Sequence, residues 1–532
     1  MLRVHESTVN GLALIANLAL GLLVGACASD IDAGNGQYPT YDPFLRVEAP
    51  AAEPGGASGA EFSPPRGPTP TLVPISVTIP ARAEGAPLVT PTPDAPRSLP
   101  TPRQVADEYV VQPGDTLGAI AQNFGVGVES LLRANDLSQD ALLSIGATLK
   151  IPPPEPGTPG PAFKVIPDSE LVYGPAAADF DVGDYVSTQG GYLSYYTQEL
   201  DTRVFSGAEV VDRIAHDYSV NPRLLLAVLE HQSRWVTTAE PMPGSFDHPL
   251  GFVQPNRTGL YHQLAWAANE LNRGFYLWRA NAAGTWVLND GSVVPIDPTI
   301  NAGTAAVQNL FAELDGRLAW EKDVTVYGLF QTYFFLFGNP FDLALDPLEP
   351  QILAQPPMQL PFEPGITWAF TGGPHAAWDS GSGWGALDFA PPDVMGCAVS
   401  DEWVTAVADG FIVRSADGAV LQDLDGDDYE QTGWNVLYMH VFQQDRVAEG
   451  SYAYAGDRIG HPSCEGGLSS AAHLHLARKY NGEWIPADGT LPFLVSGWAS
   501  IGDGREYDGF LRRGSASLEA AEGASVLNQI TR

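Results

Sequence analysis

Two histidines separated by one residue near the C-terminus constrain the fold of this 532-residue chain more than any other feature. The segment 472–476 reads AHLHL, and in a β-strand successive side chains point to opposite faces. His473 and His475 would therefore enter one cleft, while Leu474 would face the other side. The chain has 10 histidines, and four of them stand at the points of this pattern in the C-terminal region: His375, His440, His473 and His475.

These histidines and one carboxylate meet the requirements of a catalytic zinc ion. Such an ion takes about three nitrogen or oxygen ligands from the protein and keeps a position open for water. We predict that His375, Asp388 and His475 are the ligands of a single zinc ion. The surrounding segments 386–390 and 436–441 also read as strands, with Tyr438 and His440 on one face.

His440 and His473 remain outside this set of ligands. A neutral imidazole beside a metal-bound water is suited to passing protons or to holding an oxyanion. We therefore predict that both are catalytic, and the sequence does not decide which of them has which role.

Residues 360–515 resemble the M23 zinc endopeptidases, which cut the peptide crosslinks of bacterial peptidoglycan. The segment 372–390, GGPHAAWDSGSGWGALDFA, is similar to the β-lytic and staphylolytic branch, in which a glycine- and serine-rich loop separates histidine from aspartate. Here the separation is 388 − 375 = 13 residues. The commoner HxxxD spacing would select Asp379 instead. Asp379 lies in the loop, however, whereas Asp388 lies in an apolar run that can hold a ligand rigidly.

The resemblance implies an antiparallel β-sheet domain with the metal on the floor of a groove. Short alternating segments at 404–407 and 410–413, separated by turn residues, agree with that expectation. We assign this domain to residues 356–515 and a tail to residues 516–532.

The N-terminus predicts export. An apolar stretch from Gly11 to Val24 is followed by Ala26 and Cys27, and Leu23–Cys27 resembles a bacterial lipobox. The stretch is short for a spanning helix, which needs roughly 20 apolar residues. We predict a signal peptide over 1–26 with lipidation at Cys27; an ordinary secretory signal or an uncleaved anchor is the alternative.

Proline, glycine, alanine and threonine dominate from Ala28 to about Pro102, a composition that cannot bury a core. Residues 27–107 are therefore expected to form a disordered tether. The segment 108–153 then reads strand, helix, helix, strand and resembles a LysM domain, a family that binds glycans containing N-acetylglucosamine. By position, that resemblance implies a groove formed by two groups of residues: Gly114, Asp115, Thr116 and Leu117, and Asn135, Asp136 and Leu137.

Residues 154–204 are expected to form a linker and residues 205–350 a mainly α-helical domain. The segment 221–235, NPRLLLAVLEHQSRW, resembles the acid-bearing helix of lysozyme-like lytic transglycosylases. That family has a glutamate immediately before the serine, but here Gln232 precedes Ser233. An amide cannot act as general acid. Glu230 would point about 200° away from Gln232 on a helix, so we expect a noncatalytic domain.

Charge and cysteine content narrow the class of protein further. The formal net charge of −36 argues against a nucleic-acid partner and against a basic membrane patch. Cys397 and Cys464 would pair in an oxidising compartment, with two reduced thiols as the alternative.

Asp423, Asp425 and Asp427 resemble part of a calcium loop, although a solvated acidic hairpin tip is the simpler interpretation.

The sequence as a whole predicts a multidomain cell-wall hydrolase outside the cytoplasm, with a LysM domain, a lysozyme-like helical domain and a zinc endopeptidase of the M23 type. Its partners would be peptidoglycan and, through a lipid anchor alone, the membrane. Two alternatives from other classes stay open: a lytic transglycosylase that uses the helical domain, and a noncatalytic peptidoglycan-binding or regulatory lipoprotein.

Overall fold

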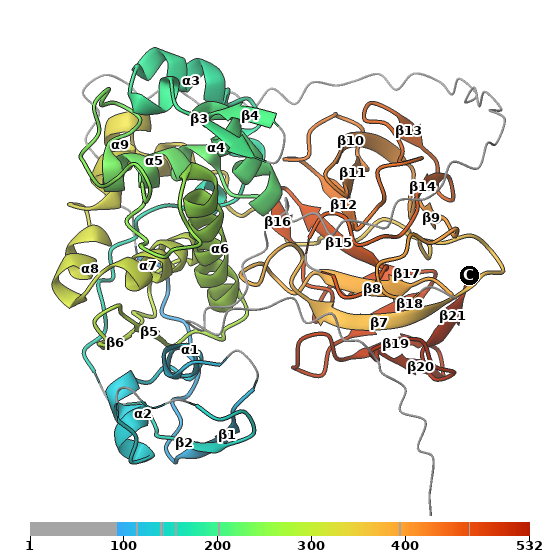
Figure 1. Ribbon diagram of the computed structural model, residues 1–532, viewed down its shortest axis with the longest axis horizontal. Coiled ribbons are helices and arrows are strands. Elements are labelled where there is room, and N and C mark those ends of the chain that lie inside the picture. Colours follow the sequence, from blue (N-terminus) through green and yellow to red (C-terminus); the bar gives the residue numbers. More distant parts are fainter. Residues whose placement is uncertain are drawn as a thin grey trace, which may run out of the picture.

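The computed structural model describes residues 93–532, apart from short gaps at 113–114, 139–140, 142, 155–156, 201–202, 393–394 and 468. It forms a small α/β unit, a helical domain and a larger β-sheet domain (Figure 1). The predicted signal peptide, Cys27 and most of the tether lie outside the described residues. Among the residues that the structure does describe, no helix is both long and apolar enough to cross a membrane.

The small unit has the predicted order of strand, helix, helix and strand. Its elements are β1 Asp107–Val110, α1 Leu117–Asn123, α2 Val128–Ala134 and β2 Thr148–Ile151. The two strands pair antiparallel, and Ile120, Leu131 and Ile151 are buried between the strands and the helices. Thr116 begins α1 because its side chain accepts a hydrogen bond from the Ala119 amide.

The helical domain is built around two long antiparallel helices, α6 and α7. Its helices are α3 Val182–Gln189, α4 Gly207–Tyr218, α5 Pro222–Ser233, α6 Leu260–Arg279, α7 Ala302–Leu314, α8 Arg317–Asp323 and α9 Leu329–Phe337. Two hairpins flank them: β3 Thr197–Leu200 with β4 Arg203–Ser206, and β5 Thr285–Val287 with β6 Val293–Pro295. Local residues fix where two of these helices begin. Ser206 and Glu209 form a capping box at the start of α4, and Pro222 stands in the first turn of α5.

Three of the expected domain boundaries differ from the structure. The end of the expected tether contacts the helical domain, because the Asp94 and Arg97 amides donate to the carbonyls of Thr299 and Pro298. Val165, Ile166 and Leu171, which lie in the expected linker, are fully buried in the helical core. The expected linker also contains α3 and β3, so it belongs to the helical domain. The expected tail likewise continues the β domain, because its last strand pairs with β7.

The β domain contains one large antiparallel sheet, in the order β13-β10-β11-β12-β15-β8-β7-β21, with β16 beside β15. Its strands are β7 Thr367–His375, β8 Ala386–Ala390, β10 Gly410–Ala416, β11 Ala419–Asp423, β12 Trp434–Met439, β13 Tyr452–Ala453, β15 Leu474–Tyr480, β16 Glu483–Trp484 and β21 Gln529–Thr531. A second sheet contains β17 Leu494–Val495, β18 Trp498–Ile501, β19 Phe510–Arg513 and β20 Ala516–Glu519, and β9 Val404–Thr405 pairs with β14 Arg458–Gly460.

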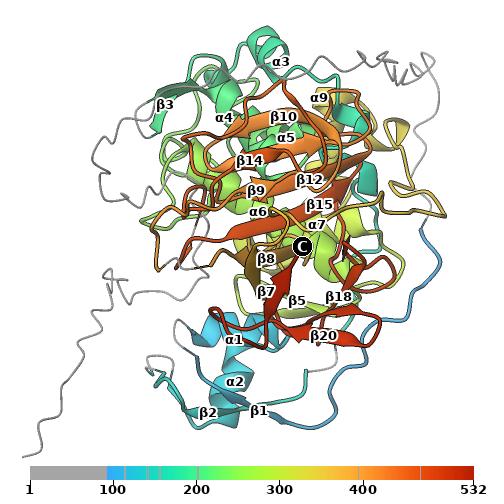
Figure 2. The same cartoon turned by 90° about the vertical axis from the view of Figure 1, so that its right-hand side faces the viewer.

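The two faces of the large sheet have different neighbours. Leu474, Leu476 and Tyr438 pack in the core of the β domain itself. Met439 and Ala477 are instead buried in the apolar cluster of the helical domain. Both views place α4 and α6 against this second face (Figures 1 and 2).

Buried charges also join these two domains. The Arg414 guanidinium lies 2.6 Å from the Asp217 carboxylate on α4, and the Lys479 ammonium lies 2.8 Å from Glu430. His216 on α4 also contacts Glu430. Separating such a pair is costly, because each partner then becomes a buried charge without compensation. The helical domain and the β domain therefore form a closely packed unit.

Candidate metal and catalytic site

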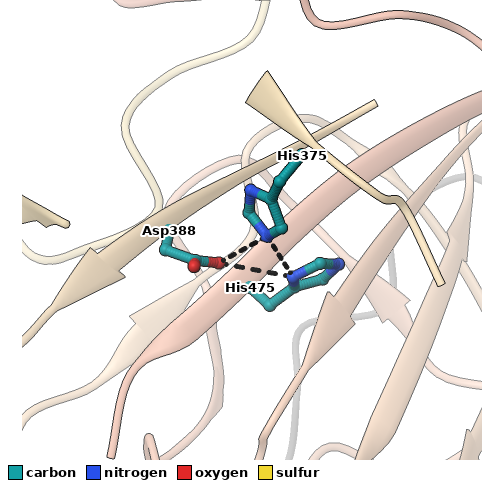
Figure 3. A group of neighbouring side chains, drawn as sticks. All are labelled: His375, Asp388 and His475. Atoms are coloured by element: carbon teal, nitrogen blue, oxygen red, sulfur yellow. Dashed lines mark hydrogen bonds and ion pairs between the residues drawn. The ribbon is translucent and has the colours of Figure 1, made fainter. Parts of the chain in front are cut away.

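Three side chains from three neighbouring strands meet on the face of the sheet that carries Met439. His475 on β15 is the direct cross-strand partner of Asp388 on β8, and β7 ends at His375 beside them. His375 Nε2 lies 2.9 Å from His475 Nδ1 and 3.2 Å from Asp388 Oδ1, and His475 Nδ1 lies 3.3 Å from the same oxygen. Figure 3 shows the triangle that these atoms form. All three residues are buried.

The other imidazole nitrogens fix the orientation of both rings. His375 Nδ1 lies 2.8 Å from the carbonyl oxygen of Gly373, and His475 Nε2 lies 3.0 Å from that of Ala377. In the neutral rings these nitrogens donate, which leaves His375 Nε2 and His475 Nδ1 with free electron pairs facing Asp388. Tyr507 stacks on the His375 ring with centroids 4.3 Å apart.

The donor set fits a divalent metal ion better than it fits a hydrogen-bond network. Asp388 Oδ1 is fully buried and accepts no well-aligned hydrogen bond, although imidazole nitrogens surround it. A buried, unsatisfied carboxylate oxygen is costly unless something else compensates it. Positive charge on the neighbouring imidazoles of His375 and His473, when these are protonated, holds the pKa of Asp388 well below its usual range in spite of its burial, so the carboxyl group is ionised. Two imidazoles and one carboxylate are a ligand set typical of catalytic zinc.

Glycine makes room for this carboxylate. A Cβ atom at Gly372, which pairs with Asp388 across β7 and β8, would lie 2.6 Å from Asp388 Oδ2. A Cβ atom at Gly373 would lie 2.3 Å from the Asp508 carbonyl oxygen. The two glycines before His375 therefore serve close packing at the site.

Asp379 does not lie in this group. Its carboxylate instead accepts hydrogen bonds from the Ser380 amide and from the Tyr218 hydroxyl of α4. Within the described residues, the groups of acids, histidines or cysteines placed closely enough to hold a metal are this triangle and the cluster of Asp423, Asp425 and Asp427.

The aspartate cluster is occupied by local contacts. Both Asp423 oxygens accept hydrogen bonds from backbone amides of the following turn, at Asp425, Gly426 and Asp428. Asp427 accepts from the Tyr429 amide and the Thr432 hydroxyl. The loop is an acidic turn held by its own backbone, and calcium is not supported there.

His440 and His473 lie at the rim of the triangle. The His473 Nε2 atom is 3.7 Å from Asp388 Oδ1, and the rings of His440 and His473 are 4.5 Å apart. His440 Nδ1 lies 2.8 Å from the Glu465 carbonyl, and His473 Nδ1 lies 2.8 Å from that of Ala471. Burial and the neighbouring histidines hold the pKa of His440 well below its usual range, so its ring is neutral.

The expected alternation of Tyr438 and His440 on one face is wrong. Tyr438 points into the core of the β domain, where its hydroxyl bonds to Gln422. β12 ends at Met439, and His440 has a φ of 67° in the left-handed region. That turn swings His440 to the metal side, which a period of two cannot predict. Tyr507, which stacks on His375, has no signal in the sequence, because it lies in a distant loop without a repeating pattern.

A disulfide lies close to these histidines. Cys397 and Cys464 are bonded with an S–S distance of 2.10 Å. The neighbouring Ser463 forms a bridge to His473, and its amide donates to the His440 carbonyl. The crosslink thus ties the segment between the two rim histidines to the loop at 397.

The residues singled out in the LysM-like unit stabilise its own loops. Asp115 accepts from the Tyr109 hydroxyl and the Gln112 amide, and Asn135 bridges Leu131 and Lys150. Leu117 and Leu137 are half-buried against the core, and Asp136 has a φ of 55°. Gly114 lies outside the described residues.

Known proteins match several parts of the chain. Residues 109–152 match the LysM domain family, and residues 164–350 match the family described as LasA, N-terminal domain. Protease LasA of Pseudomonas aeruginosa strain UCBPP-PA14 is 26% identical over 352 residues, which cover 60% of this chain and 75% of that protein.

Two solved structures match smaller parts of the chain. The M23 metalloprotease pseudoalterin from the deep sea is 23% identical, covering 34% of this chain and all of that one, with a TM-score of 0.28. The catalytic domain of lysostaphin from Staphylococcus simulans is also 23% identical, covering 23% of this chain and 89% of that one, with a TM-score of 0.17.

These matches confirm the LysM prediction, and the helical domain matches the LasA N-terminal domain. The lysozyme-like interpretation of that domain is not confirmed. The chain therefore combines a LysM domain with a LasA-type N-terminal domain, and it is a relative of Protease LasA.

Proposed function

We propose that this protein is a zinc-dependent endopeptidase that cleaves the peptide crosslinks of peptidoglycan. The observation that carries the proposal is the convergence of His375, Asp388 and His475 around a buried carboxylate oxygen that accepts no well-aligned hydrogen bond. The relationship to a protease and the LysM domain support the reaction class and the substrate.

In this proposal His375 Nε2, Asp388 Oδ1 and His475 Nδ1 hold one zinc ion. When bound there, zinc supplies a Lewis acid for the scissile carbonyl and lowers the pKa of a bound water. The Gly373 and Ala377 carbonyls keep the two ligand rings in the tautomer that faces the ion.

His440 and His473 are the proposed proton-transfer residues. With its Nδ1 proton held by a backbone carbonyl, each neutral ring presents Nε2 as an acceptor. Such a nitrogen can take a proton from the attacking water, and the resulting imidazolium can return it to the leaving amine or stabilise an oxyanion. The two rings are adjacent, so they can divide these roles.

We assign the LysM domain to glycan recognition. Its groove would be formed by the two groups of residues predicted from the sequence, 114–117 and 135–137. Among the described members, Asp115 and Asn135 hold the loops in shape through hydrogen bonds to the backbone. A shaped backbone site fits a protein of net charge −36, which gains no general attraction to anionic wall polymers.

We place the activity outside the cytoplasm. The Cys397–Cys464 disulfide fits an oxidising compartment. The predicted signal peptide and lipidation of Cys27 belong to this proposal, as does attachment to the membrane through that lipid alone.

The helical domain is proposed to be noncatalytic. Both Glu230 oxygens are occupied: Oε2 accepts from the Val236 and Thr237 amides, and Oε1 accepts from the Thr237 hydroxyl. Glu230 thus stabilises the turn after α5 and is not available as a general acid for glycan cleavage.

Mass spectrometry of the fragments that the full chain releases from purified peptidoglycan tests the proposal. We expect new peptide amino termini, no anhydro sugar ends, and loss of release when zinc is removed by a chelator and recovery when it is restored. Anhydro sugar ends would favour a transglycosylase, and intact crosslinks with the zinc-loaded protein would favour a noncatalytic wall-binding protein.

A further inference from the structure

The glycine- and serine-rich segment 376–385, here called the Gly-Ser loop, touches the metal site at one end. The Ala377 carbonyl is the acceptor for His475 Nε2 at 3.0 Å. The loop is braced internally, because the Ala377 amide donates to the Gly383 carbonyl and the Trp378 amide donates to Ser382 Oγ. A shift of the tip at 379–382 would therefore be passed to Ala377.

The tip of the same loop is held by the helical domain. The Tyr218 hydroxyl on α4 donates to Asp379 at 3.2 Å. On α6, Asn269 Oδ1 accepts from the Gly381 amide at 2.7 Å, while Asn269 Nδ2 donates to Ser380 Oγ at 3.3 Å. Arg273 donates to Ser380 Oγ as well, at 3.1 Å.

Glycine in the loop serves this contact. A Cβ atom at Gly381 would lie 2.0 Å from the Asn269 carbonyl oxygen, and one at Gly383 would lie 2.9 Å from the Tyr276 ring. Neither position has a positive φ, so close approach to α6 accounts for both glycines. The composition that makes the segment look like a free loop is what allows it to dock.

We propose that Tyr218 and Asn269 are positioning residues for the metal ligand His475, acting through the Gly-Ser loop and the Ala377 carbonyl. The helical domain would then be part of the functional metal site, since it sets the ring orientation of one ligand from outside the β domain. This inference rests on the zinc site of the proposed function. Groups that orient a ligand histidine typically change metal affinity 10–100-fold when they are removed.

The test is zinc affinity of the full-length protein, measured by competition with a chromogenic chelator. Asn269→Ala removes the acceptor for Gly381 and should weaken zinc binding about 10-fold, at the lower end of the range for outer-shell groups. Tyr218→Phe removes one oxygen atom and should weaken binding measurably but by less than about 10-fold, the lower end of the range for outer-shell groups. Gly381→Ala, which forces the loop from α6, should act in the same direction as Asn269→Ala.

Ser219→Ala is the matched control for Tyr218→Phe. Ser219 is the next residue on the same helix end and also makes one hydrogen bond to the β domain, to the Gly482 carbonyl at 2.8 Å, but it does not touch the loop. Zinc affinity of this variant should equal that of wild type. Cobalt(II) in place of zinc adds a spectroscopic readout: its visible absorption bands should shift in Asn269→Ala and stay unchanged in Ser219→Ala.

Unchanged zinc affinity and cobalt spectra in both Asn269→Ala and Tyr218→Phe would overturn the proposal. A higher rate of peptide release in these variants would overturn it too, because the contact would then be a restraint on the site. If wild type itself bound no zinc, the proposed function would fail, which is a separate result from equal binding by all variants.

Discussion

Glu230 in the helical domain and Asp388 in the β domain are both buried carboxylates, and they differ in what their oxygens contact. Glu230 accepts two backbone amides and one hydroxyl, all from the turn that follows its own helix. Asp388 presents one oxygen to imidazole nitrogens without a well-aligned hydrogen bond. A satisfied buried carboxylate stabilises a fold, whereas an unsatisfied one carries a cost that a ligand can offset.

The same contrast extends to another buried carboxylate of the helical domain. Glu170 is held by the Arg223 guanidinium at 2.7 Å and by Asn221 and Tyr333. Glu170 and Glu230 thus stabilise the helical domain, whereas Asp388 leaves one oxygen without a hydrogen bond at a point where three strands meet. Asp217 and Glu483 also have a buried oxygen without a hydrogen bond, but arginines face those two carboxylates, whereas imidazoles face Asp388. Function is therefore expected from the sheet, and substitutions in the two regions should have different consequences.

Removing Asp388 should have the largest effect. Asp388→Ala deletes one of three proposed ligands, so zinc affinity should fall by more than the roughly 100-fold that can follow loss of an outer-shell group. Peptide release should be lost with it. Chelator competition and a crosslink-cleavage assay measure the two effects.

Asp379→Asn is the control for this substitution, since Asp379 stands at the HxxxD spacing from His375 but bonds to Ser380 and Tyr218. It should keep zinc. Zinc retained by Asp388→Ala and lost by Asp379→Asn would show that the wrong aspartate has been assigned.

Removing a rim histidine should reduce the rate and spare the metal. His473→Ala and His440→Ala should each lower kcat by about 10²–10⁴-fold, the range for a proton-transfer group, with zinc still bound. Steady-state kinetics on a crosslinked peptide and metal analysis of the same sample provide the two measurements. Loss of zinc together with activity would mean that a ligand has been taken for a catalyst.

Removing Glu230 should change stability and leave the reaction unchanged. Glu230→Ala leaves two buried amides and a hydroxyl without their acceptor, which should lower the free energy of unfolding by about 2–4 kcal/mol. Denaturant unfolding followed by tryptophan fluorescence measures this. The exposed Glu240→Ala should shift stability by less than about 0.5 kcal/mol, as surface changes do. Altered cleavage products in Glu230→Ala would contradict the structural role.

The sequence indicates the metal site more fully than it indicates the domain arrangement. The alternation around His475 and the apolar run around Asp388 are local patterns, and the sheet register then places the two side chains opposite each other. His440 is reached only through a left-handed turn, which no alternation encodes. Val165 and Leu171 sit among turn residues, so their burial depends on distant helices. The Gly-Ser loop docks on α6 through tertiary contacts, whereas its composition alone predicts a flexible segment.

Gln232→Glu should have the smallest effect and is the most direct test of the resemblance of α5 to an acid-bearing helix. Gln232 lies in the last turn of that helix, one residue before Ser233, where the resembling family has its glutamate. A carboxyl there acts as general acid only if a glycan cleft faces it and raises its pKa. The apolar residues of α5 are instead packed in the helical core, and the domain matches the LasA N-terminal family. We expect no anhydro sugar products from Gln232→Glu on purified peptidoglycan, with crosslink cleavage equal to wild type. Glycan cleavage gained by this single change would show that the helical domain retains a sugar-binding cleft that lacks only its acid. The difference in catalytic ability between the two domains would then depend on one side chain.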